Sequence, residues 1–169
     1  ITKGDRLNVA TALDGMNGTL KDAIDNDWKS RFYSSSFNIG YRHSFRNMDL
    51  NLGGGFHSRV FNYMLSPISS ISGENDKQHH TLGDFYVGLS STDEMMPLQF
   101  TVQTGFQYFK QKYPAISDEN STEKIIHTAG DVWGKLSDIQ RVGIKFEMDN
   151  LFYSDDLMKD YTSLGLNPY

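Results

Sequence analysis

Apolar and polar side chains alternate along residues 31–64 with a period of two, in two consecutive stretches. The apolar positions share one parity within each stretch: Tyr33, Phe37, Ile39, Tyr41 and Phe45, then Leu50, Leu52, Phe56 and Val60. Only a polar connection at residues 46–49 separates the stretches. Successive side chains of a β-strand point to opposite faces, so the pattern predicts one antiparallel hairpin. Each arm has about fourteen residues, against a usual strand of about 5–6, which is typical of strands that cross a thick layer.

The same alternation recurs along the chain. It predicts strands at residues 81–91, 98–111, 128–137 and 139–149, with fainter ones at 5–14 and 160–168. Trp133 falls among the polar positions of its segment. The total is about eight strands. Residues 15–30 have a helix as an alternative, because Leu20, Ala23, Ile24 and Trp28 have helical spacing.

The predicted connections alternate in length. Short ones fall at residues 46–49, 91–97 and 137–139, and long ones at 15–30, 65–80, 113–127 and 150–159. An up-and-down barrel with an even number of strands places all short turns at one end and all long loops at the other. We therefore expect an all-β, antiparallel up-and-down transmembrane β-barrel as a single domain over residues 1–169. Both a complete barrel and a piece of a larger one fit this pattern.

The polar positions are rich in Ser, Asn, Gln, Thr and Gly, with isolated charges of both signs. A wetted exterior normally has denser Lys and Glu, whereas a narrow lumen needs small residues and charges that can pair. We therefore expect a lumen-lining polar network of Arg42, Asn51, His57, Arg59, Asp84, Gln99, Gln103, Gln107, Asp131, Lys135, Arg141, Lys145 and Glu147. Aromatic residues make up 13% of the chain, and Tyr33, Tyr41, Phe45, Tyr108 and Tyr161 are the predicted members of aromatic girdles at the lipid interfaces.

The strand pattern and loop rhythm resemble the small eight-stranded outer-membrane barrels of Gram-negative bacteria, such as the OmpA transmembrane domain and OmpX. The resemblance implies a bacterial cell outer membrane, with short periplasmic turns and long extracellular loops. It also implies contact with outer-membrane lipid and lipopolysaccharide, and a protein partner at the loops. Tyr169 is an aromatic last residue, as outer-membrane proteins often have, but Leu164 and Leu166 have the opposite parity and Pro168 interrupts the strand.

Four functions remain open at this point. The first is a structural or surface-interaction barrel, with narrow transport of small solutes as an extension of that role. The others are a larger or incomplete porin-like transport barrel, a lipid A-modifying acyltransferase or deacylase, and a soluble lipocalin-like ligand-binding barrel. The formal net charge is −5 and no basic stripe is present, so nucleic acid is not an expected partner. Cysteine is absent, which excludes disulfides, thiol catalysis and cysteine metal sites.

No catalytic sequence motif is present, and neither a cofactor nor a metal is expected. His79, His80 and His127 are the weak metal candidates, because adjacent histidines on a strand point in opposite directions. The same histidines, with Ser66, Ser69, Ser70 and Ser72, lie near the outer rim, where lipid A-modifying enzymes have a His and Ser constellation. Gly53, Gly54 and Gly55 lie within a strand, where we expect a bend or room for a bulky neighbour.

Overall fold

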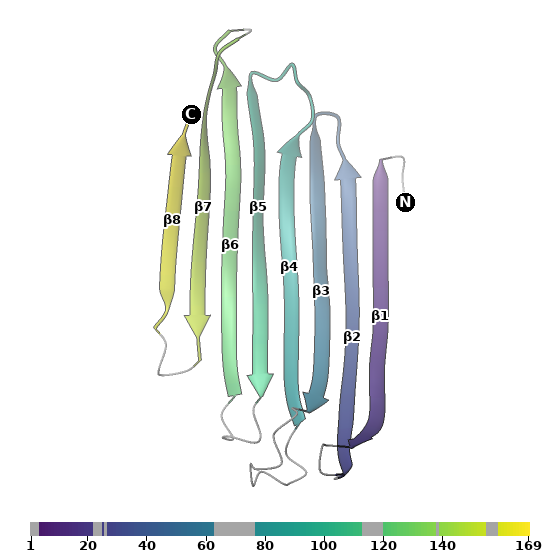
Figure 1. Ribbon diagram of the computed structural model, residues 1–169. Helices are drawn as coiled ribbons and strands as arrows, with labels where there is room; N and C mark the ends of the chain where they lie inside the picture. Colours follow the sequence, from purple (N-terminus) through teal and green to yellow (C-terminus); the bar gives the residue numbers. More distant parts are fainter. Residues whose placement is uncertain are drawn as a thin grey trace.

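The computed structural model describes residues 4–21, 25, 27–62, 77–112, 120–137, 139–154 and 159–169, and its regular structure is β-sheet. The strands are β1 (Asp5–Lys21), β2 (Asp27–Ser44), β3 (Met48–Asn62), β4 (Lys77–Ser91), β5 (Leu98–Lys112), β6 (Asn120–Lys135), β7 (Arg141–Tyr153) and β8 (Tyr161–Pro168). They form one sheet in chain order (Figure 1), and each strand pairs antiparallel with the next. The predicted set of eight antiparallel up-and-down strands is confirmed.

Most strands extend beyond their predicted limits at the end with the long connections. Residues 15–21 and 27–30 belong to the β1–β2 hairpin, so the alternative of a helix is wrong for the described part of residues 15–30. Leu20 and Trp28, whose spacing suggested the helix, are backbone partners across this hairpin. Similarly, β4 begins at Lys77 and β6 at Asn120. In most of these extensions the face that is apolar elsewhere in the strand has polar residues or glycine, such as Asn17, Lys77 and Lys124, so apolar periodicity could not reveal them.

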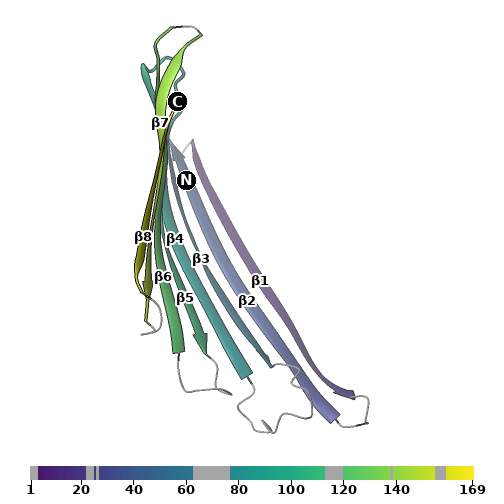
Figure 2. The same ribbon diagram turned by 60° about the vertical axis from the view of Figure 1, so that its left-hand side comes forward.

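The sheet is open. Within the described residues β1 pairs only with β2 and β8 only with β7, so the predicted closure into a barrel is not found. Figure 2 shows the sheet bent into a curved wall one strand layer thick, with β1 and β8 along different edges. Among the described residues, no helix is long and apolar enough to cross a membrane.

The described part of the sheet has no hydrophobic core. None of its hydrophobic residues is buried, and large ones such as Leu13, Phe56 and Phe85 are 86%, 48% and 56% exposed. A sheet with one apolar face needs something apolar against that face. The described residues do not supply this covering.

The cross-strand register assigns the side chains to two faces. We call one the apolar face, and one row across it runs from β1 to β8 through Val9, Ile39, Gly54, Phe85, Phe106, Ile126, Asn150 and Thr162. We call the other the polar face, and one of its rows is Arg6, Arg42, Asn51, Gly88, Gln103, Ala129, Glu147 and Gly165. Trp133 is on the polar face, as its parity predicted, opposite Gln99 and Gly143.

The apolar face has a continuous charge-free region, which we call the apolar belt. It consists of the alternate residues of this face within Leu7–Leu13, Tyr33–Tyr41, Met48–Val60, Gly83–Leu89, Leu98–Tyr108, Ile126–Gly134, Val142–Phe152 and Leu164–Leu166. Tyr33, Tyr41 and Tyr108 are at its margins, where girdle residues belong. Tyr161 is opposite Leu151 on the polar face, so it does not share a face with these three tyrosines.

Candidate functional site

All the predicted lumen residues fall on the polar face. The register aligns Arg42, Asn51, Gln103 and Glu147 in one row, and it pairs Asp131 directly with Lys145. The remaining members have the same parity on their strands. That this face lines a lumen stays a prediction.

One part of this network closes the β2–β3 turn. The guanidinium of Arg42 forms an ion pair with the carboxylate of Asp49, and Asp49 is only 3% exposed. Backbone hydrogen bonds complete the turn, with the N–H of Phe45 donating to the carbonyl of Met48 at 2.8 Å. Asp49 was not predicted as a member of the network, because it lies at the limit of the predicted turn.

A second part joins β6, β7 and the last residue. The hydroxyl of Tyr169 donates to Asp131 Oδ1 at 2.6 Å, and Lys145 Nζ is 3.9 Å from Asp131 Oδ2. Lys145 also lies 5.3 Å from the centre of the Tyr169 ring, and Arg141 lies 4.5 Å from that of Trp133. These cation–π contacts, together with the hydrogen bond from Tyr169, join cations and aromatic rings on the polar face. Tyr169 was missed as a member because no parity rule applies beyond the end of a strand.

A third group contains His127, Glu147 and Asp149. His127 Nδ1 is 2.5 Å from Asp149 Oδ1, and one ligand atom of each residue lies within 4.8 Å of the others. An imidazole and two carboxylates are ligand types that divalent metals accept. Here the close contact already engages Nδ1 of His127 and one oxygen of Asp149, so the group acts first as a hydrogen-bonded pair. His127 lies inside β6, not at a loop end as predicted, because β6 begins seven residues earlier at Asn120.

The second and third groups surround a shallow hollow of about 630 Å³. Its lining includes Gln103, His127, Asp131, Lys145, Glu147 and Asn167. Both signs of charge and amide groups face the same space, so the hollow can accommodate water, ions or a polar solute. It is the main concentration of polar chemistry on the described part of this face.

His79 and His80 point to opposite faces, as predicted for neighbours on a strand. His80 is on the polar face, where the side-chain amide of Gln111 donates to His80 Nε2 at 2.8 Å. The rings of Phe61 and Phe109 lie 5.0 and 5.8 Å from the His80 ring. His79 is on the apolar face, opposite Val60. The two histidines therefore cannot share one metal ion or one catalytic site.

The arrangement for acyl transfer is not found in the described part of the chain. Ser66, Ser69, Ser70 and Ser72 lie outside the described residues. Ser163 is opposite Asp149, and Asp149 is opposite His127, so the carboxylate lies between the other two. A nucleophilic triad needs the imidazole between the hydroxyl and the carboxylate.

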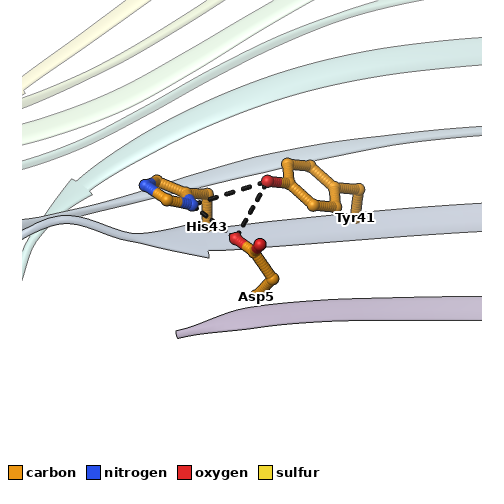
Figure 3. A network of polar contacts seen from close by, with 3 residues as sticks. All are labelled: Asp5, Tyr41 and His43. Atoms are coloured by element: carbon orange, nitrogen blue, oxygen red, sulfur yellow. Dashed lines mark hydrogen bonds and ion pairs between the residues drawn. The ribbon is translucent and has the colours of Figure 1, made fainter. Parts of the chain in front are cut away.

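A polar group on the apolar face marks its short-turn end. Asp5, Tyr41 and His43 contact one another there (Figure 3), with Tyr41 Oη donating to Asp5 Oδ1 at 3.0 Å and His43 Nδ1 lying 2.5 Å from the same oxygen. Phe45 packs edge-on against His43 at 4.4 Å. Tyr41 therefore has its ring beside the apolar belt and its hydroxyl in a polar cluster, as an interfacial tyrosine does.

Comparison with protein-family models, with curated proteins and with solved structures finds no match to this chain. No function therefore passes to it from a relative.

Proposed function

We propose that this chain forms part of the wall of a bacterial outer-membrane β-barrel that transports small polar solutes. In this proposal the apolar face lies against lipid and the polar face against an aqueous lumen. The apolar belt carries the proposal: it crosses all eight strands without one Asp, Glu, Lys, Arg or His, whereas the same stretch of the polar face has Arg59, Asp84, Asp131 and Lys145. A lipid-facing surface imposes this difference, because a charge at the bilayer midplane costs roughly 2–4 kcal/mol.

The height of the belt fits a bilayer. On β5 it runs from Leu98 to Tyr108, ten steps of about 3.4 Å along the strand. At a strand tilt of about 45°, that length spans ~25 Å of membrane, which is the height of the apolar band on outer-membrane barrels.

The belt is also oblique to the strands, and its slope gives the tilt independently. At the edge of the belt nearer the long connections, the first charged residues of the apolar face are Arg31 on β2 and Lys124 on β6. Lys124 lies in the row of Phe37, six residues along β2 from Arg31. Six residues are about 20 Å of strand, and four strand spacings are about 19 Å, so the edge is inclined by roughly 45°.

The edge of the belt nearer the short turns slopes in the same sense. Leu7 on β1 lies in the row of Thr104, six residues along β5 from Leu98, the first residue of that strand. Two parallel, oblique edges are expected where tilted strands pass through a flat apolar layer. For amphipathic strands in water, nothing requires the boundary between apolar and charged residues to follow one plane across neighbouring strands.

Side-chain crowding favours the polar face as the inside of the curve. On the inner strands β2–β7, the large polar-face residues are half-buried: Phe32, Phe61, Leu82, Tyr86, Phe109, Ile125, Trp133 and Leu151. On the apolar face of the same strands, Phe37, Phe56, Phe85 and Phe106 are each more than 40% exposed, and Phe100 and Phe146 are half-buried, so most of the phenylalanines there are exposed. Side chains converge on the inside of a curved sheet and diverge on the outside. This supports a polar lumen over the apolar interior of a lipocalin-like barrel.

The open edges favour a barrel with more than eight strands. Unpaired backbone N–H and C=O groups cost several kcal/mol each in hydrocarbon, so strands in a membrane need partners on both sides. The outer side of β1 and that of β8 have none among the described residues. An interior of eight strands holds only side chains, whereas wider barrels hold a water-filled channel. The hollow around His127 and Glu147 would then be part of a channel wall.

Cysteine labelling tests the two faces directly, since the native chain has no cysteine. The neighbours Val102→Cys and Gln103→Cys place a thiol on the apolar belt and on the polar face of the same strand. In lipid vesicles, we expect a water-soluble maleimide to label Gln103→Cys at least tenfold faster than Val102→Cys. The opposite order would indicate an apolar interior and overturn the proposal. Recovery of the protein from cells without detergent would do the same.

Planar-bilayer conductance tests the width. A barrel of more than eight strands is expected to give stable open-channel steps that scale with salt concentration. A protein that labels as expected yet never conducts would favour the structural or surface-interaction role over transport.

A further inference from the structure

The charge on the apolar face changes where the belt ends towards the long connections. In the described strands this end presents Lys21, Arg31, Lys77, Lys110, Lys112 and Lys124 on the apolar face. Asp27 is the one carboxylate there among the described strand residues, and it is opposite Lys21. No ion pair joins Lys77, Lys110, Lys112 or Lys124 to another described residue. The margin of the belt nearer the long connections is therefore basic over at least four strands.

A hollow of about 610 Å³ lies at the boundary between this basic margin and the belt. Arg31, Lys77 and His79 line it from the basic side, and Tyr33 and Val60 line it from the side of the belt. Asn17 adds an amide. The hollow thus combines cations, hydrogen-bond donors and apolar surface, which is the combination that the interfacial part of a lipid requires.

A second hollow of about 370 Å³ continues from the first into the belt. The two share Tyr33 and Val60. The second is also lined by Leu13, Gly15, Ser35 and Ser58, and by Asp14 and Ser34, which have the parity of the polar face. Small residues leave room here that larger ones fill elsewhere in the belt. At Gly15 a Cβ atom would lie only 3.0 Å from the Tyr33 ring, so glycine keeps the site open. The result is a groove in the lipid-facing surface that leads from the cations into the apolar belt.

We propose that these two hollows form one binding site for a phosphorylated glycolipid of the lipid A type, a proposal that rests on the membrane orientation proposed above. Arg31 and Lys77 bind a headgroup phosphate, and an acyl chain lies in the groove over Gly15, Ser35 and Ser58. Arginine binds phosphate through two parallel hydrogen bonds, and lysine adds a point charge. Tyr33 supports the junction between headgroup and chain.

The extent of the basic margin favours a glycolipid with several phosphates over a phospholipid with one. From β2 to β6 it covers four strand spacings, or about 19 Å. A single phosphate can neutralise the cations of the hollow but not Lys110, Lys112 and Lys124 as well. The acyl groove in turn favours a lipid over free phosphate.

The test compares two variants with the same loss of charge. Arg31→Gln with Lys77→Gln removes the cations of the hollow, and Arg46→Gln with Lys135→Gln removes an arginine and a lysine at the other end of the sheet. For the protein purified in detergent, binding of bisphosphorylated lipid A is measured by native mass spectrometry. We expect the first variant to lose affinity about thirtyfold, since each cation near an anionic lipid surface contributes roughly fivefold. The control should stay within twofold of the parent.

A third variant addresses the groove without changing charge. Ser35→Phe fills the groove from the lipid-facing surface, where an added aromatic ring is compatible with folding. It should weaken binding of lipid A at least tenfold. Heat-modifiable gel migration checks that each variant is folded.

Three results would overturn the site. Equal losses in the two charge variants would indicate general attraction only. Equal binding of dephosphorylated lipid A would remove the role of phosphate, and equal binding of phosphatidylglycerol would remove the choice of a glycolipid. Any of these leaves the labelling difference between Val102→Cys and Gln103→Cys intact, so failure of the site is distinguishable from failure of the proposed orientation.

Discussion

The two faces of this sheet share one backbone and one set of hydrogen bonds, and they differ only in the parity of their side chains. Val102 and Gln103 are adjacent in sequence, yet one lies in a charge-free belt and the other in a row with Arg42 and Glu147. In a soluble protein the apolar side of such a sheet would be packed against a second layer. Here the apolar face is not covered by other described residues, so its composition reflects what surrounds the protein.

The contrast between the faces fades along the strands towards the long connections. There the apolar face has Lys77, Lys110 and Lys124, while the polar face has the aromatic residues Phe61 and Phe109. A strand segment surrounded by water on both sides has no reason to keep its faces distinct. This loss of contrast is what the proposed orientation predicts where the strands leave the apolar layer.

A charge placed in the belt should have the largest effect. Val102→Arg puts a guanidinium near the middle of the belt on β5, and we expect it to destabilise the folded protein by about 2–4 kcal/mol. Urea titration of the protein in lipid vesicles, followed by tryptophan fluorescence, measures the change in the free energy of unfolding.

The matched control is Gln103→Arg, one residue away on the polar face. We expect it to change the free energy of unfolding by less than about 1 kcal/mol, because the residue is exposed and the face already contains cations. Equal costs for the two arginines would mean that the faces have similar surroundings, against the proposed orientation.

Parity explains how much of this fold the sequence could predict. Wherever one face is apolar, as in β5, the predicted strand of residues 98–111 matches the structure to one residue. The extensions at Gly15–Lys21 and Lys77–His80 were not predicted, because the face that is apolar elsewhere in these strands has only glycine and polar residues here. Parity also predicted correctly that all the proposed lumen residues share one face of the sheet, because that assignment needs only the strands and their register.

Closure and contacts between distant residues could not be predicted from the same pattern. Whether β1 meets β8 depends on the curvature and number of strands, which alternation does not encode. The contact between Asp131 and Tyr169 joins residues from β6 and the chain end, and it depends on the register of β7 between them. Arg31 and Lys77 come together in the same way, from strands on either side of β3.

On the polar face, loss of the ion pair at the β2–β3 turn should have the next largest effect. Arg42→Ala leaves the nearly buried carboxylate of Asp49 with its hydrogen bond from Ser44 but without its opposite charge, and a buried charge that loses its ionic partner is destabilising. Because the Arg42 side chain is itself 47% exposed, we expect a loss of about 2 kcal/mol in the free energy of unfolding, below the range of about 3–5 kcal/mol for fully buried pairs. Urea titration measures it.

The control is the ion pair between Lys21 and Asp25, whose side chains are 63% and 81% exposed. Lys21→Ala should cost no more than about 0.5 kcal/mol, since water solvates both charges when the pair breaks. Similar losses for Arg42→Ala and Lys21→Ala would show that Asp49 regains solvent in the variant, and that the turn does not depend on the pair.

The smallest effect comes from two neighbouring glycines on the polar face, Gly40 and Gly53, which are opposite each other on β2 and β3. A Cβ atom at Gly53 would lie 2.5 Å from the Tyr86 ring, as expected for a strand glycine that makes room for a bulky neighbour, whereas one at Gly40 would meet nothing within 4 Å. We expect Gly53→Ala to destabilise the protein by about 1–2 kcal/mol through overpacking. Gly40→Ala should be neutral or slightly stabilising, because alanine loses less backbone entropy on folding.

In the double variant Gly53→Ala with Tyr86→Ala, the added methyl should no longer cost stability relative to Tyr86→Ala alone. If Gly53→Ala costs the same with and without the Tyr86 ring, strand flexibility and not packing on the polar face explains the glycine.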